Sequence, residues 1–326
     1  MDIVTWERRP SLRHPLLVSA FEGWNDAGDA ATLAASYLID AWGAERFATI
    51  DPEEFFDFTS TRPQTRIVDG AHRRLDWPTI EMLSATVPGT DRDVIFVRGI
   101  EPQLRWRTFC RAIVEVATAA GTELVIILAA LLADVPHTRP VRVTGTTDDV
   151  ELSGRMGLVR SDYEGPTGIV GVLASACADA GLPAASFWAA VPHYVHQVPS
   201  PKAALALVRR SAALLGARIN PLELQVAAED YERQVSERVA DDEDAAAYVA
   251  HLEEADDSDG PPGGGARGGL GAEAPNAEGM GAEPMRAEGP DSGGMGGSGL
   301  DGSGLDADGL ADEVERFLRG HRRRDG

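Results

Sequence analysis

The chain has 326 residues, of which 43% are hydrophobic, and a formal net charge of −22. This length and apolar content are sufficient for one large α/β domain with additions, or for two domains. The acidic balance argues against the basic surface that phosphate contacts require, so we expect no nucleic acid as a partner.

The sequence lacks the signals of a secreted or membrane protein. Residues 1–10 lack the apolar run of a signal peptide, and the longest apolar run, 124–133, is about half the length that crosses a bilayer. We therefore expect a soluble, cytoplasmic protein with no membrane partner. Cys110 and Cys177 lie in apolar helical patterns, which favours buried free thiols. No zinc spacing, dinucleotide fingerprint or Walker fingerprint is present, so we expect no metal and no cofactor.

The first predicted unit is a buried strand over 16–21, a tight polar turn and a helix over 31–42. Ligands bind where such turns follow the strands of an open α/β sheet. The candidate ligand-binding residues of this turn are Glu22, Gly23, Trp24, Asn25 and Asp26. The alternative is that the polar groups satisfy the turn backbone and that Asp26 or Asp29 caps the helix. Capping explains one carboxylate but not three polar groups beside a tryptophan.

A second strand, 46–51, follows, and a strand, helix and strand in this order predict a right-handed parallel unit. Residues 64–68 and 73–77 have β character and flank Asp69-Gly70, which is a hairpin signal. Residues 80–85 continue this pattern, so we assign 64–87 to an inserted β-hairpin arm. The arm makes subunit contacts or packs on its own sheet.

Further polar loops follow the later predicted strands. The strand 94–97 leads to Arg98 and Glu101, and the most apolar strand, 124–132, is followed by a short strand at 141–144. The loop 161–168 contains Tyr163, Glu164 and Thr167 and enters a helix over 169–180, which Thr167 is expected to cap.

The last predicted strand, 187–191, precedes His193, the one histidine that we select for acid–base work. Each of these side chains has a simpler interpretation. Arg98 and Glu101 are solvated loop residues, Tyr163, Glu164 and Thr167 form no recognised phosphate fingerprint, and His193 is structural. Lys202 is the only lysine, which leaves one candidate for lysine chemistry, and no catalytic set is identified by motif.

These patterns divide the chain into four parts. Residues 1–220 form an α/β core with a mostly parallel or mixed central sheet flanked by helices. Residues 221–254 form a C-terminal helical lid or appendage. Residues 255–309 are rich in glycine, alanine and acidic residues and are expected to be a disordered linker. Residues 310–326 form a short amphipathic helix with a basic tail.

Several of these segments together resemble the PAC2 family, which is related to proteasome assembly chaperone 2 and has many bacterial members of unknown activity. The resemblance covers roughly residues 1–254 and rests on Gly23-Trp24-Asn25-Asp26-Ala27-Gly28, on 51–58 with Arg62-Pro63, on 163–168 and on 192–201. It implies a core like that of purine nucleoside phosphorylases and peptidyl-tRNA hydrolases. It also implies a homotrimer with an inserted hairpin at the subunit contact and a helical segment over a pocket. Residues 64–77 and 221–254 match those two additions.

Two functional hypotheses follow. The first is a homo-oligomeric binding or assembly protein, chaperone-like, that holds a protein partner or a small polar ligand at the carboxyl ends of the strands. The second is a phosphorylase- or hydrolase-like enzyme, or a ligase, that acts on a small polar metabolite. The resemblance carries over no established catalytic residue.

Overall fold

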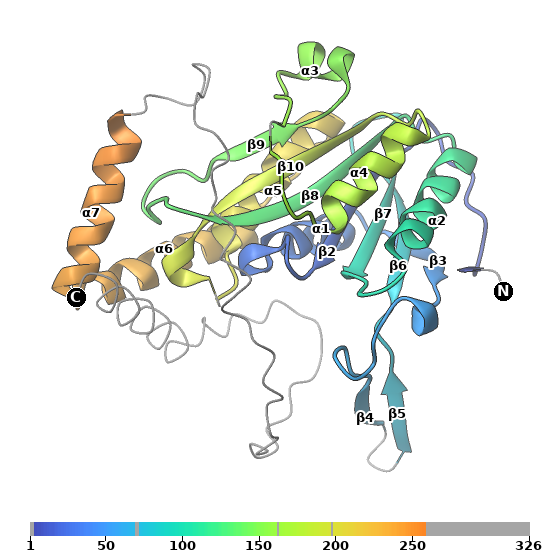
Figure 1. The fold of residues 1–326 in the computed structure, drawn as a ribbon, viewed down its shortest axis with the longest axis horizontal. Coiled ribbons are helices and arrows are strands. Elements are labelled where there is room, and N and C mark those ends of the chain that lie inside the picture. Colours follow the sequence, from blue (N-terminus) through green and yellow to red (C-terminus); the bar gives the residue numbers. More distant parts are fainter. Residues whose placement is uncertain (1–2, 69–71, 162, 197, 259–326) are drawn as a thin grey trace.

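The computed structural model describes residues 3–68, 72–161, 163–196 and 198–258 (Figure 1). Ten strands are present in this part of the chain: β1 (Val4–Trp6), β2 (Leu16–Glu22), β3 (Glu45–Ile50), β4 (Gln64–Val68), β5 (His72–Asp76), β6 (Ile80–Thr86), β7 (Asp93–Ile100), β8 (Leu124–Ala133), β9 (Val143–Thr146) and β10 (Ala184–Pro192). The α-helices of the same part are α1 (Ala30–Ala41), α2 (Trp106–Ala119), α3 (Val150–Met156), α4 (Ile169–Asp179), α5 (Pro201–Leu215), α6 (Leu222–Ala240) and α7 (Glu243–Ser258).

Eight strands form one mixed sheet in the order β1-β3-β6-β7-β2-β8-β10-β9. The four neighbours β7, β2, β8 and β10 are parallel, and antiparallel strands continue the sheet on both sides of them. Both faces of the parallel part are covered, which explains why β2 and β8 are continuous apolar runs rather than alternating ones. The predicted α/β class with a mixed central sheet is confirmed.

Helices cover the two faces of the sheet in pairs. Helices α1 and α5 pack on one face, where alanines such as Ala31 and Ala204 allow close approach, and α2 and α4 pack on the other (Figure 1). Successive residues of β2 divide between the two cores, with Val18 on the α1 side and Leu17 on the α2 side. The carboxyl ends of the parallel strands therefore lie between two helical layers.

The predicted parallel unit of β2, α1 and β3 is present, but its two strands are not neighbours in the sheet. Strand β3 runs in the same direction as β2, but β7 and β6 lie between them. Hydrophobic periodicity defines each element, whereas the choice of neighbour depends on contacts between segments far apart in the chain. Helix α3 was not predicted, and its N-terminus is capped by the carboxylate of Asp149, which accepts from the backbone N–H groups of Glu151 and Leu152.

The hairpin β4–β5 forms a separate two-stranded sheet that projects from the body (Figure 1). We call it the arm, residues 64–77. Strand β6, which the sequence analysis included in the range 64–87, instead pairs with β3 and β7 in the main sheet. Its buried residues Ile80, Met82 and Leu83 are the physical reason, because they belong to the core of the main sheet.

Helices α6 and α7 form the predicted C-terminal helical segment, and α7 continues to Ser258, past the expected boundary at 254. Tyr231 and Val235 of α6 and Val249 of α7 share a small apolar cluster with Tyr194. The expected linker at 255–309 lies almost wholly outside the described residues, and the expected helix and basic tail at 310–326 lie entirely outside them. None of the described helices has the length and apolarity needed to cross a membrane.

Candidate functional site

The carboxyl ends of β2 and β7 define the predicted site. The helix that follows β2 packs on one face of the sheet, and the helix that follows β7 packs on the other. Such a reversal opens a crevice between neighbouring strand ends, which is where open α/β sheets bind ligands. The loops that begin at Gly23 and Glu101 leave the sheet at this point.

The turn after β2 is held by its backbone. Gly23 has a φ of +129°, a conformation that side chains disfavour, and its carbonyl accepts from the Asp26 N–H at 3.0 Å. The carbonyl of Asn25 accepts from the N–H of Ala130 in β8 at 2.8 Å. The turn therefore bridges two neighbouring parallel strands, and it leaves the Trp24 side chain 53% exposed.

Asp26 caps α1. Its buried carboxylate accepts from the backbone N–H of Ala31 at 2.6 Å and also bonds to the Thr32 hydroxyl. Burial raises the pKa of Asp26 to about 6, although the hydrogen bonds from Thr32 and Ala31 oppose the shift. Of the two predicted caps, the structure uses Asp26, while the Asp29 side chain makes no cap hydrogen bond.

Glu101 joins three loops. One carboxylate oxygen accepts from the N–H of Ile169 at 2.7 Å, and the other lies 3.4 Å from the N–H of Trp24. Its own N–H donates to the carbonyl of Glu22 at 2.8 Å. The expected cap of α4 was Thr167. The structure corrects this, because the Thr167 hydroxyl faces the carbonyl of Gly168 and Glu101 accepts from the first helical N–H.

Asn25 packs against the loop that enters α4. A Cβ placed on Gly168 would lie 2.1 Å from Asn25 Oδ1 and 3.0 Å from Glu101 Oε1, so only glycine fits there. The Oδ1 atom of Asn25 is buried and has no hydrogen-bond partner among the described residues. A buried acceptor without a donor is costly, which makes Asn25 the most unusual polar group of this turn.

Arg98 and Glu22 lie beside this cluster. The Arg98 guanidinium donates two hydrogen bonds of 3.1 Å to one oxygen of Glu81 and a third, of 3.2 Å, to the hydroxyl of Ser36. Partial burial, followed by repulsion from Asp29, raises the pKa of Glu22, and Arg98 acts in the opposite direction. Arg98 is therefore an ion-pair partner within the sheet, and its proposed contact with a ligand stays a prediction.

The remaining predicted residues make other contacts. Tyr163 is 43% exposed and donates to the carbonyl of Pro166 at 2.9 Å, and Glu164 is exposed. His193 lies elsewhere along the sheet edge, where its Nδ1 is 3.0 Å from a carboxylate oxygen of Asp134. Its ring packs edge-on against Tyr194 and Tyr248. The structure thus brings together the 22–26 turn, Glu101 and the start of α4, and it places His193 in a different cluster.

A second histidine, His137, was passed over by the sequence analysis. It is 3% exposed, and its ring nitrogens lie 2.8 Å from the Tyr194 hydroxyl and 3.0 Å from the Ser236 hydroxyl. Burial, reinforced by Lys202, lowers the pKa of His137 to about 4, so the ring is neutral at pH 7. The only signals in the sequence were its position between two prolines after the most apolar strand and the single lysine.

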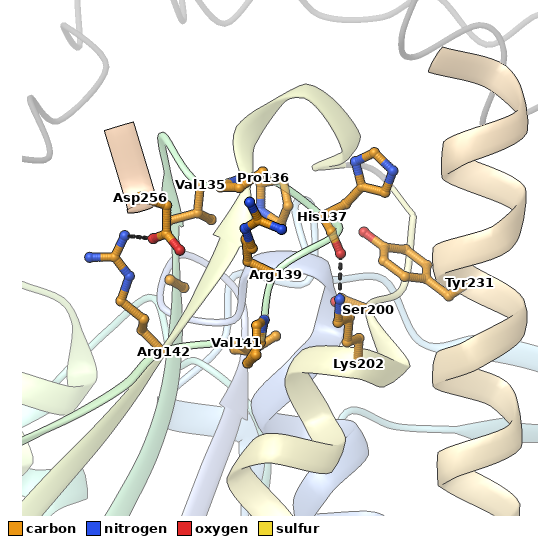
Figure 2. Close-up of a pocket in the computed structure, with 13 residues that line it drawn as sticks. Val135, Pro136, His137, Arg139, Val141, Arg142, Ser200, Lys202, Tyr231 and Asp256 are labelled. Carbon is orange, nitrogen blue, oxygen red and sulfur yellow. Dashed lines mark hydrogen bonds and ion pairs between the residues drawn. The ribbon is translucent and has the colours of Figure 1, made fainter. Parts of the chain in front are cut away.

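Lys202 donates to the backbone carbonyl of His137 (Figure 2). It also donates to a carboxylate oxygen of Glu232 in α6 at 2.5 Å. His137 and Lys202 form one wall of a small hollow with a volume of about 20 Å³. It is lined by Val135, Pro136, His137, Arg139, Pro140, Val141, Arg142, Ala190, Pro192, Ser200, Lys202, Tyr231 and Asp256. This space holds about one water molecule, and none of the eleven predicted ligand-binding residues lines it.

The arrangement has clear chemical consequences. The carboxylates of Asp26 and Glu101 are engaged by backbone N–H groups and so hold loops in this conformation, whereas Arg98 pairs with Glu81 between two strands of the sheet. Within the described part of the chain, no group of three or more histidine, cysteine, aspartate or glutamate side chains is placed to hold a metal ion. The exposed Trp24 and the Asn25 Oδ1 atom remain as ligand-contact candidates.

Comparisons with known proteins agree on the family. The PAC2 family model matches residues 20–239. A PAC2 family protein from Streptomyces avermitilis is 49% identical with a TM-score of 0.69, and a proteasome-assembly chaperone homologue from Mycobacterium tuberculosis is 47% identical with a TM-score of 0.66. Each match covers 72% of this chain and 99% of the other.

A proteasome activator from Pyrococcus furiosus is 19% identical over 72% of this chain and 97% of its own, with a TM-score of 0.59, and it shows a shared fold. No curated protein matches the chain. The extent of the family match and the two relatives at nearly half identity confirm the resemblance that the Gly23–Gly28 motif indicated. The chain belongs to the PAC2 family.

Proposed function

We propose that this protein is a homo-oligomeric assembly protein, chaperone-like, in which the arm of one subunit packs on the next. Its family and the Mycobacterium tuberculosis relative, described as a proteasome-assembly chaperone homologue, support the assembly role. By extension from that relative, the partner is a proteasome subunit. We place the complex in the cytoplasm and expect a trimer, as the sequence resemblance implies.

The observation that carries the proposal is the uncovered apolar face of the arm. Cross-strand pairs put Thr65 and Leu75 on the same face as Ile67 and its partner Arg73, and Ile67 and Leu75 are 68% and 54% exposed. The opposite face carries mainly charged and polar side chains beside Val68, and Asp76 pairs there with Arg66 at 2.6 Å and with Arg74 at 2.8 Å. A two-stranded hairpin alone is marginally stable in water, so an apolar face on one indicates a covering surface.

A second copy of this chain is the occupant that we propose for this face. The body exposes a further apolar pair, Leu222 and Val226, at 59% and 51% on the first turns of α6. An arm that packs on a different patch of the next subunit makes a head-to-tail contact. Such contacts close into rings when the rotation permits. A ring of three is the expected result.

The test is the mass of the full chain in solution, measured by light scattering after size exclusion. Wild type is expected at three times the monomer mass, and the double variant Ile67→Asp, Leu75→Asp is expected at the monomer mass with its circular dichroism unchanged. Gln64→Glu, on the polar face, is the matched control and should remain trimeric. A monomeric wild type, or a trimeric double variant, would overturn the role of the arm.

The partner requires a separate measurement. Purified proteasome subunits from the same organism, mixed with the wild-type chain, are expected to form a complex that is visible by size exclusion and to assemble faster than without it. Absence of both effects with a properly oligomeric wild type would reject the proteasome partner and leave the oligomer standing.

The alternative is an enzyme, of phosphorylase, hydrolase or ligase type, that acts on a small polar metabolite. One observation favours it: the unpartnered Asn25 Oδ1 beside the exposed Trp24, at the point where the flanking helices change face. A ligand that binds the folded state raises the melting temperature by mass action. A metabolite-library thermal shift that disappears in Asn25→Ala would support this hypothesis, and the absence of any shift with wild type would reject it.

A further inference from the structure

The connection between β8 and β9 holds three carboxylates that all come from the end of α7. Arg139 donates to Asp257 at 2.7 Å, Arg142 pairs with Asp256, and the Thr138 hydroxyl bonds to Glu253. Three donors within five consecutive residues, 138–142, are thus occupied by one helical turn. We call residues 138–142 the donor loop and residues 253–257 the acidic turn.

The acidic turn conflicts with the helix that carries it. A helix C-terminus has a partial negative charge, which favours basic side chains and disfavours acidic ones. The last turn of α7 has no basic residue, and Glu253, Glu254, Asp256 and Asp257 crowd its end. A sequence departs from a local preference of this kind where a contact or a function elsewhere in the protein requires it. The donor loop provides such a contact, because its two arginines pair with carboxylates that α7 itself does not stabilise.

The donor loop offers further groups that could bind a ligand. Arg139 and Arg142 both line the small hollow at the sheet edge (Figure 2). The Arg139 Nε–H is buried and lacks a hydrogen-bond partner within the described ranges. Lys202 in the same wall stays paired with Glu232 of α6. Removal of the acidic turn would therefore leave two uncompensated guanidinium groups that line one hollow, and it would free the hydroxyl of Thr138 in the same loop.

These groups define the ligand that fits. Two guanidinium forks and a hydroxyl match the geometry and charge of a dianion with several acceptor oxygens, and arginine binds such groups in a bidentate manner. The side chains are 36% and 66% exposed in the pair of Arg139 with Asp257, and 45% and 21% exposed in the pair of Arg142 with Asp256. Water therefore partly screens both ion pairs, and a competing anion can displace them.

We propose that the donor loop is a binding site for a small dianionic oxyanion, a phosphate or a dicarboxylate, and that the acidic turn of α7 occupies it in the closed state. The ligand and the acidic turn compete for the same donors. Ligand binding therefore releases the end of α7 from the sheet edge. The site is distinct from the arm and from the Trp24 turn, so it stands or falls independently of the proposed assembly function.

The experiment uses the full chain and two probes, inorganic phosphate and succinate, titrated calorimetrically at constant ionic strength set with chloride. The variant Asp256→Asn, Asp257→Asn removes the competing charges and is expected to bind a probe at least about tenfold more tightly than wild type. Adding Arg142→Gln to that variant should reverse the gain. Glu254→Gln is the matched control, since Glu254 lies in the same turn, is exposed and forms no ion pair within the described residues.

The two probes separate the ligand classes. Binding of phosphate alone identifies a phosphate-bearing ligand, binding of succinate alone identifies a dicarboxylate, and binding of both supports the shared chemistry. If neither probe binds the double variant, or if Arg142→Gln leaves binding unchanged, the proposal is wrong. Hydrogen exchange provides a second readout: the amides of 253–257 in wild type should exchange faster with saturating probe, and unchanged protection in the bound state would contradict the competition.

Discussion

The carboxylate of Glu101, just past the end of β7, accepts a hydrogen bond of 2.7 Å from the backbone N–H of Ile169, the first residue of α4. The same side chain approaches the N–H of Trp24 in the turn after β2. One carboxylate thus caps a helix that begins 68 residues later in the chain and holds the loop beside it. The candidate site is organised around this contact.

Replacing Glu101 tests its role as an anchor. Glu101→Ala leaves the first N–H of α4 without its acceptor and is expected to lower the free energy of unfolding by about 2 kcal/mol, as the loss of a helix cap or of a charged hydrogen bond does. Urea denaturation of the full chain measures this change. Glu164→Ala, in an exposed position of the loop before α4, is the control and should change stability by less than about 0.5 kcal/mol. Equal losses would contradict the anchoring role.

Gly168 tests how tightly Asn25 is packed. In Gly168→Ala the new Cβ would meet Asn25 Oδ1 at 2.1 Å, so we expect a loss of about 1–3 kcal/mol from overpacking. Asn25→Gly in the same chain removes the clashing atoms and should restore part of that stability. Gly154→Ala is the control, because no atom lies within 4 Å of its Cβ position in α3, and there alanine should be neutral or stabilising. A double-mutant cycle with no coupling between positions 25 and 168 would refute the contact.

Asp26 gives the chain a pH dependence of known sign. Its pKa is about 6 when folded and 3.8 ordinarily, so the folded state binds a proton more readily than the unfolded state. The contribution of Asp26 therefore becomes more favourable as the pH falls from 7 to well below 3.8, by about 3 kcal/mol in total. Asp26→Asn removes this titration but keeps an acceptor for Ala31. Urea unfolding at pH 7, 5.5 and 4 should show that the variant becomes steadily less stable than wild type as the pH falls. A constant difference between the two would disprove the raised pKa of Asp26.

His137 acts in the opposite direction over an overlapping range. Its pKa falls from 6.5 to about 4 on folding, so the unfolded state binds the proton first, and stability is lost as the pH falls from 6.5 toward 4. The size of this loss is also about 3 kcal/mol. His137→Gln should be less stable than wild type at pH 7, because the contact with Ser236 is weakened, yet lose less stability on acidification. A steeper acid loss in His137→Gln would be incompatible with a buried neutral ring.

Local patterns were sufficient for much of the fold. The apolar run before Gly23, the helix that follows it and the hairpin strands around Asp69-Gly70 each depend on the properties of a few adjacent residues, and each strand or helix was predicted in place. The motif Gly23–Gly28 also indicated the family, because the turn that it forms needs glycine and polar groups at fixed positions.

The partners of these elements were decided by the tertiary structure. Strand β6 joins the main sheet rather than the arm, and β3 lies beyond β6 and β7, since sheet order depends on which buried faces meet. The cap of α4 comes from Glu101 rather than Thr167, and His193 lies with Tyr194 and Tyr248 rather than with Asn25. Each of these outcomes joins residues far apart in the chain. No local periodicity encodes such contacts, because they form only when the packed sheet brings its strand ends together.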